Sequence, residues 1–191
     1  TGKKQALDVL ARVFVPDSGI DSAGEDGEVA KVCGAIAELD LGGNALAGWA
    51  PVQTIASQLP KLQWLGLDRM PLPTLETLPE GFGAAFGGLT TLCLSGTGMQ
   101  WAQLLFLAGT MPKLSELHFS SNKLSSLRVD GAADVATVLG SLTELYLEQN
   151  AIASWEDLAP LATLPKLQTL HAGANPLQLP PPLPPLPPDK A

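Results

Sequence analysis

Hydrophobic residues recur along the chain in blocks that combine two periods. The first part of a block has apolar residues at alternate positions, as in Leu39 and Leu41, which is typical of a short, half-buried strand. The second part has apolar residues three or four positions apart, as in Trp49, Val52 and Ile55, which is typical of a helix with one buried face. The pattern predicts short strands that alternate with helices.

The blocks are internal repeats. Apolar residues fit the spacing L-x-x-L-x-L-x-x-N-x-L about seven times, in steps of roughly 25 to 28 residues. The copies begin at Leu10, Ile36, Leu62, Leu89, Leu114, Leu142 and Leu167, of which the first is degenerate. We therefore predict an α/β leucine-rich repeat solenoid, a horseshoe with short parallel strands on its concave side and helices on its convex side.

Two kinds of residue within the repeats have predicted structural roles. Asparagine occupies the ninth position in four copies, where its amide can satisfy backbone groups of the turn that leaves the strand: Asn44, Asn122, Asn150 and Asn175. Met70 holds this position in another copy and cannot do so. Tryptophans open three of the predicted convex helices, each ahead of a Pro-Lys-Leu run, and we expect them to pack against the neighbouring repeat: Trp49, Trp101 and Trp155.

The repeats divide the chain into three parts. We expect an N-terminal segment at 1–9, the repeat domain at 10–177, and a proline-rich cap or linker at 178–191 in the polyproline II conformation. A run of prolines can blunt the open edge of the last strand. Alternatively, Pro185, Pro188 and Lys190 form a P-x-x-P-x-basic motif, which is typical of ligands of SH3 domains.

Composition narrows the classes of function. Lys plus Arg number 11 and Asp plus Glu number 19, so the net charge of −8 disfavours binding to nucleic acid. No apolar run reaches transmembrane length, and we expect no membrane association. The two cysteines, Cys33 and Cys93, are predicted on opposite sides of the repeat and therefore unpaired. With no cysteine cluster and no N-x-S/T acceptor, a cytoplasmic location is favoured.

The concave face is the predicted binding surface. Residues on either side of the strand leucines point out of this face, and many of them are acidic or aromatic. The candidate protein-binding residues are Glu38, Asp40, Trp64, Asp68, Glu116, His118, Glu144, Tyr146, Glu148 and His171. Trp64 is the first candidate for a binding anchor and Tyr146 the second. The alternative is that such a face tolerates these residues without a partner.

One row of the concave face carries residues capable of chemistry. Cys93, His118, Tyr146 and His171 are predicted to occupy equivalent positions on four successive strands. They lie in a line, whereas a tetrahedral zinc site needs ligands that converge, and no Asp or Asn is placed to orient a catalytic histidine. We therefore predict a protein that is not an enzyme, with no catalytic residue, metal or cofactor.

The particular variant of the repeat resembles a known family. The run 22–30, the segment 36–46 followed by Trp49, and the Ser-Gly-Thr-Gly-Met-Gln-Trp run at 95–101 are similar to the leucine-rich domain of the tubulin-folding cofactor E family. So is the segment 112–117. The resemblance covers about residues 10 to 177.

The resemblance implies a chaperone role. Members of this family look like three-part proteins, in which the solenoid lies between a cap-glycine domain and a ubiquitin-like domain. The resemblance implies that this chain is a non-catalytic module that contacts α-tubulin or other tubulin-folding cofactors during assembly and disassembly of the α/β-tubulin heterodimer. An acidic concave face predicts contact with a basic patch of that partner. The alternative is a cytosolic scaffold or phosphatase-regulatory subunit that binds another protein through the same face.

Overall fold

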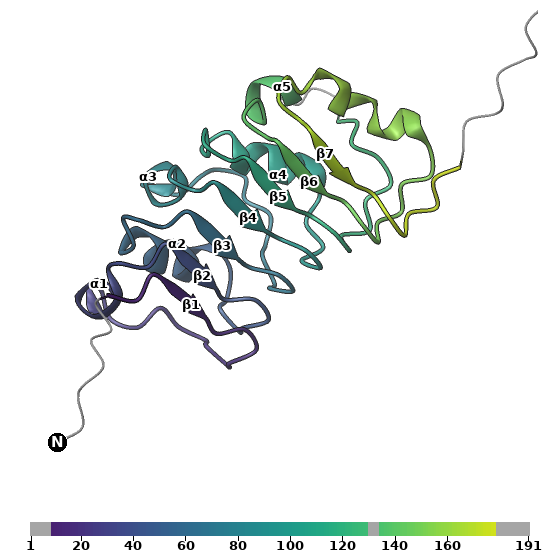
Figure 1. The fold of residues 1–191 in the computed structure, drawn as a ribbon. Coiled ribbons are helices and arrows are strands. Elements are labelled where there is room, and N and C mark those ends of the chain that lie inside the picture. The colour runs from purple at the N-terminus through teal and green to yellow at the C-terminus, as the bar shows by residue number, and fades with distance from the viewer. Residues whose placement is uncertain (1–8, 130–133, 179–191) are drawn as a thin grey trace, which may run out of the picture.

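The computed structural model describes residues 9–129 and 134–178, and this part of the chain forms a seven-stranded parallel sheet in chain order (Figure 1). The strands are three residues long: β1 (Arg12–Phe14), β2 (Glu38–Asp40), β3 (Trp64–Gly66), β4 (Thr91–Cys93), β5 (Glu116–His118), β6 (Glu144–Tyr146) and β7 (Thr169–His171). Each lies beside the next strand in the sequence, as stacked repeats require.

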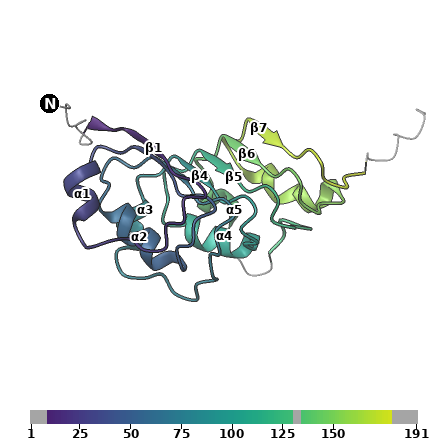
Figure 2. The ribbon, with the colours of Figure 1, turned by 90° about the horizontal axis from the view of Figure 1, so that it is seen from below.

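The helices lie on the side of the solenoid that is opposite the sheet (Figure 2). In the described residues they are α1 (Glu28–Cys33), α2 (Trp49–Ser57), α3 (Phe82–Phe86), α4 (Trp101–Ala108), α5 (Val135–Val138) and the 3-10 helix η2 (Trp155–Thr163). The predicted α/β leucine-rich repeat solenoid is therefore confirmed. The last convex element is a 3-10 helix that contains Pro160, which has no N–H to donate to an α-helical hydrogen bond.

The strands share one register, so equivalent residues form straight rows across the sheet. Leu39 lies opposite Val13 on one side and Leu65 on the other, and this pairing of middle residues continues to Leu170. The middle leucines of β2 to β6 are buried in one continuous core. Their neighbours along each strand therefore point to the concave face, as the alternation predicts.

The two end repeats are less well covered than the inner ones. Val13 of β1 is only partly buried, and Leu170 of β7 is 37% exposed. The equivalent leucines of β2 to β6 are each no more than 4% exposed. Each end strand has a neighbouring strand on one side only within the described residues, which explains the difference.

Asparagine side chains tie successive repeats together. The amide oxygen of Asn150 accepts hydrogen bonds from the backbone N–H groups of Asn122 (2.9 Å) and Leu124 (3.1 Å) in the preceding repeat. Its amide nitrogen donates to the carbonyls of Phe119 (3.0 Å) and Leu147 (2.9 Å). Asn44, Asn122 and Asn175 also link their own turn to that of the repeat before, which confirms the role predicted for this position.

This ladder of amides is interrupted in the middle of the solenoid. Met70 fills the position with an apolar side chain that is fully buried in the core. Thr97, the next member, donates its hydroxyl to the Leu94 carbonyl within its own turn and to the Oδ1 of Asn122. Backbone hydrogen bonds such as Arg69 N–H to the Ser95 carbonyl (2.8 Å) still join these repeats.

Two of the three convex tryptophans pack as predicted. Trp49 is 2% exposed and lies edge-on against Phe82 and Phe86 of the next repeat, and Trp101 is equally buried against Phe119. The prediction is wrong for Trp155, which is 50% exposed. The repeat after Trp155 contributes only β7 and its turn to the described residues, with no convex helix to cover the ring.

Candidate functional site

All ten predicted binding residues lie on the concave side of the strands, in β2 to β7 or just after them. Each is half-buried, with its side chain partly accessible to solvent. They do not form one continuous cluster. The structure gathers them into a C-terminal group on β5 to β7 and an N-terminal group on β2 and β3, with buried residues of β4 between the two.

Three stacked rings form the centre of the C-terminal group. His118, Tyr146 and His171 occupy the same position on adjacent strands. The rings of His118 and Tyr146 are 4.1 Å apart and 6° from parallel, and those of Tyr146 and His171 are 4.3 Å apart and 2° from parallel. The distance between rings is close to the spacing of neighbouring strands, about 4.8 Å. The regular register of the sheet therefore produces the stack.

Carboxylates flank this stack and hold its polar atoms. Glu116 Oε1 lies 2.7 Å from His118 Nε2, and Tyr146 donates its hydroxyl proton to Glu144 Oε2 at 3.1 Å. The hydrogen bond to Glu144 is the main reason that the pKa of Tyr146 is raised. Glu148 accepts a hydrogen bond from Ser120 Oγ at 2.7 Å and places its other oxygen 4.0 Å from His171 Nδ1.

An aromatic pair forms the centre of the N-terminal group. Trp64 contacts Phe14 edge-on, with the ring centroids 5.8 Å apart. The indole extends over Gly66, because a Cβ at that position would lie 2.8 Å from its Cη2 atom. Trp64 is consequently half-buried rather than fully exposed. Asp40 also approaches Gly66, so a glycine is required there for both side chains to lie across the backbone.

Two residues of this N-terminal group were not among the predicted binding residues. Phe14 is 54% exposed, and Arg12 pairs with Glu38 at 3.0 Å. Both occupy outward positions of β1, equivalent to those of the predicted residues. The strand alternation in the sequence is enough to place both residues on the concave face, but it does not show that they contact Glu38 and Trp64.

Buried residues of β4 separate the two groups. Thr91 and Cys93 occupy outward positions, yet they are only 7% and 4% exposed. Burial is the main cause of a strongly raised pKa for the Cys93 thiol, and the carboxylates of Asp68, Glu116 and Asp40 raise it further. The thiol therefore stays protonated at neutral pH, which disfavours a nucleophilic role.

Asp68 lies near the boundary between the two groups. Burial raises the pKa of this carboxyl, although the Ser95 backbone N–H donates a hydrogen bond to Asp68 Oδ1 at 2.6 Å and opposes the shift. His118 lowers this pKa and Asp40 raises it, so ionisable residues of both groups lie within electrostatic reach of Asp68.

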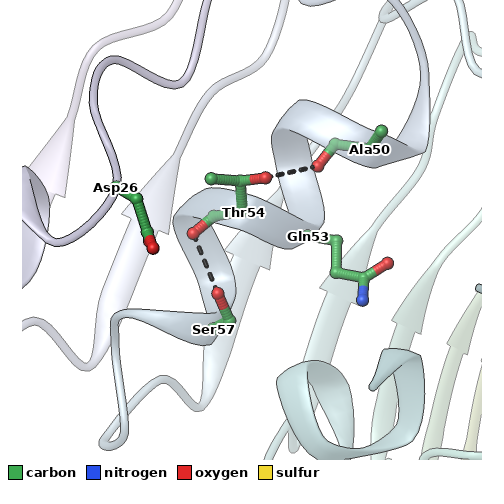
Figure 3. A pocket seen from close by; sticks show the side chains of 5 residues that line it. All are labelled: Asp26, Ala50, Gln53, Thr54 and Ser57. Carbon is green, nitrogen blue, oxygen red and sulfur yellow. Dashed lines mark hydrogen bonds between the residues drawn. The ribbon is translucent and has the colours of Figure 1, made fainter. Parts of the chain in front are cut away.

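A hollow of about 480 Å³ on the convex side offers a second surface (Figure 3). Asp26, from the loop before α1, points toward α2, where Ala50, Gln53, Thr54 and Ser57 line the hollow. The Thr54 and Ser57 hydroxyls donate to carbonyls of their own helix, and Gln53 donates to the Glu80 carbonyl. These donors are already engaged within the fold, so the hollow carries little chemistry for a ligand.

The other predictions concern metal ligands, membrane-spanning helices, the two cysteines and the proline motif. Within residues 9–129 and 134–178, no three His, Cys, Asp or Glu side chains converge in a way that would hold a metal ion. Over the same residues, every helix is too short or too polar to span a membrane. Cys33 and Cys93 are both free. The proposed ligand motif of Pro185, Pro188 and Lys190 lies outside the described residues.

Fold comparison assigns the chain to the leucine-rich repeat class of solenoids. It superposes on the leucine-rich repeat domain of APL1B with a TM-score of 0.53 at 19% identity, over 89% of this chain and 43% of that one. It superposes on internalin C2 from Listeria monocytogenes with a TM-score of 0.52 at 21% identity, over 91% of this chain and 75% of the other. At these identities the likeness concerns the fold alone. No protein-family model matches the chain.

Sequence comparison confirms the resemblance to the tubulin-folding cofactor E family. The chain is 31% identical to tubulin-specific chaperone E of Xenopus laevis over 173 residues, which cover 91% of this chain and 32% of the relative. It is 28% identical to tubulin-folding cofactor E of Arabidopsis thaliana, over 83% of this chain and 29% of the relative. A human tubulin-specific chaperone cofactor E-like protein is also 28% identical, over 90% and 39% respectively. The chain spans about a third of the length of these relatives.

Proposed function

We propose that this chain is a non-catalytic protein-binding module of a tubulin-folding cofactor, acting in the cytoplasm in assembly and disassembly of the α/β-tubulin heterodimer. Its partners are then α-tubulin and other tubulin-folding cofactors, and it binds neither nucleic acid nor membranes. The observation that carries the proposal is the match of about 90% of the chain to relatives named for tubulin folding.

The concave face is the proposed contact surface. It presents the Trp64–Phe14 pair, which is a large apolar group beside carboxylates, and aromatic residues of this kind often dominate the energy of protein interfaces. The remaining contacts come from the outward residues of β2 to β7: Glu38, Asp40, Asp68, Glu116, His118, Glu144, Tyr146, Glu148 and His171. Because most of these residues are acidic, the matching surface of the partner is basic.

Paired tryptophan substitutions test this function. Trp64→Ala is expected to weaken association of the chain with α-tubulin and the other folding cofactors at least tenfold, because truncated aromatic anchors typically cost about 2 kcal/mol or more. Trp155→Ala removes an exposed tryptophan from the convex side and should leave association unchanged. Light scattering of the mixed proteins measures both. If the unmodified chain fails to associate with any of them, the proposal is wrong.

The scaffold or phosphatase-regulatory alternative uses the same face and makes a different prediction. In a pulldown from cell extract, the unmodified chain would then capture a partner that is not tubulin or a tubulin-folding cofactor. The variant that combines Trp64→Ala with Glu148→Lys would lose this partner.

A further inference from the structure

Within residues 9–129 and 134–178, the ring stack of the concave face ends at His171. At the other end, His118 is followed on β4 by Cys93, a small and buried residue that contributes no ring to the stack. β7 is the last strand of the described residues, and none of their aromatic rings stacks on the outer face of His171. The His171 side chain is 43% exposed, so part of the imidazole is accessible to solvent.

A carboxylate lies beside this open ring. Glu148 Oε1 is 4.0 Å from His171 Nδ1, and the other oxygen of Glu148 is fixed by the hydrogen bond from Ser120. The Glu148 side chain remains 35% exposed. None of the outward positions of β5 to β7 carries Lys or Arg. A planar ring and a positioned carboxylate therefore lie next to each other.

We propose that the outer face of His171, together with Glu148, binds an arginine side chain of the partner protein. A guanidinium is planar, stacks on aromatic rings, and donates parallel hydrogen bonds to a carboxylate. In this position it extends the column of parallel rings by one step and pairs with Glu148. A lysine ammonium matches the charge but has no plane to stack, so the surface selects arginine over lysine. This inference rests on the proposed function, since it names the chemistry of a protein partner.

The test uses two peptides of equal charge. Blocked octapeptides of alternating arginine and glycine, or lysine and glycine, are titrated into the isotopically labelled chain at low salt and followed by amide chemical shifts. We expect the arginine peptide to bind about threefold to fivefold more tightly than the lysine peptide, as a solvent-accessible stacked cation would give. The shift changes should centre on β6 and β7.

Matched variants separate stacking from charge. His171→Leu should reduce the preference for arginine to about one, whereas His171→Phe keeps a planar face and should retain it. Glu148→Gln should weaken binding of the arginine peptide about fivefold. Glu156→Gln removes the same charge from an 86% exposed side chain on the convex side and should change binding less than about twofold. Circular dichroism and the unfolding midpoint check that each variant is folded.

Several results would overturn the inference. These are equal affinity of the unmodified chain for the two peptides, shift changes away from β6 and β7, or equal effects of Glu148→Gln and Glu156→Gln. A failure here would be distinguishable from a failure of the proposed function. Association with tubulin that depends on Trp64 can persist without arginine selectivity, and arginine selectivity can persist in a chain that binds no tubulin.

Discussion

At the scale of single residues, a side-chain amide joins two repeats that have no covalent link at that point. Asn150 makes four hydrogen bonds to backbone groups of two turns, and it is buried. Buried backbone groups need partners, because leaving them unpaired costs more free energy than an average hydrogen bond contributes. The stacking of these turns therefore depends on a few amides rather than on apolar contacts alone.

Asn150→Ala is expected to lower the free energy of unfolding by about 2 to 4 kcal/mol, because four buried backbone groups lose a partner. Gln149→Ala is the matched control. Gln149 is exposed, and its side-chain oxygen only accepts a bond from the Ser121 hydroxyl, so a loss of at most about 0.5 kcal/mol is expected. Urea unfolding followed by circular dichroism measures both. Equal losses would show that the amide does not tie the repeats together.

At the scale of elements, the convex helix α2 is stabilised by the repeat that follows it. α2 presents Trp49 to Phe82 and Phe86 of α3, and the Trp49 Nε1 donates to the Pro73 carbonyl at 3.2 Å. η2 begins with the same residue type at Trp155, but the ring is half exposed. Helices of four to nine residues are too short to be stable alone, so packing between repeats decides whether they form.

The contrast between Trp49 and Trp155 gives a prediction for the elements. Trp49→Ala should lower the free energy of unfolding by about 3 to 5 kcal/mol, because it leaves a cavity between α2 and α3. Trp155→Ala should lower it by less than about 1 kcal/mol, since Trp155 is already half exposed to solvent. The urea midpoints of the two variants provide the comparison. A similar loss in both would mean that the position in the repeat, and not the packing, determines the contribution.

At the scale of the whole molecule, the sequence predicted what depends on periodicity and missed what depends on neighbours. The alternation around Leu39 and its equivalents was enough to place all ten candidate residues on one face. It did not predict that Trp64 would lie across Gly66 toward Phe14, or that Cys93 would be buried at an outward position. Those outcomes depend on the sizes of side chains on adjacent strands, which are about 25 residues apart in the chain.

The solenoid is also predicted to differ in local stability from its centre to its ends. Stacked repeats contact only their neighbours, so an end repeat has one stabilising interface where an inner repeat has two. The first repeat is further weakened by an apolar cavity of about 350 Å³, lined by residues that include Val13, Val29 and Ile55. At the opposite end, Leu170 remains partly exposed. Both ends should therefore open more easily than the middle.

Amide hydrogen exchange measures this gradient directly. The backbone N–H groups of Leu67, Leu94 and Phe119 bond to carbonyls of the next repeat in the middle of the solenoid, and we expect them to exchange only through global unfolding. Val15, whose N–H bonds to the Asp40 carbonyl, should exchange at least about tenfold faster through local opening of the first repeat. Val29→Leu adds a methylene group beside the cavity and should slow exchange at Val15 without changing that at Phe119. Uniform protection from Val15 to Phe119 would instead mean that the repeats unfold as a single cooperative unit, with the cavity making no difference to the first one.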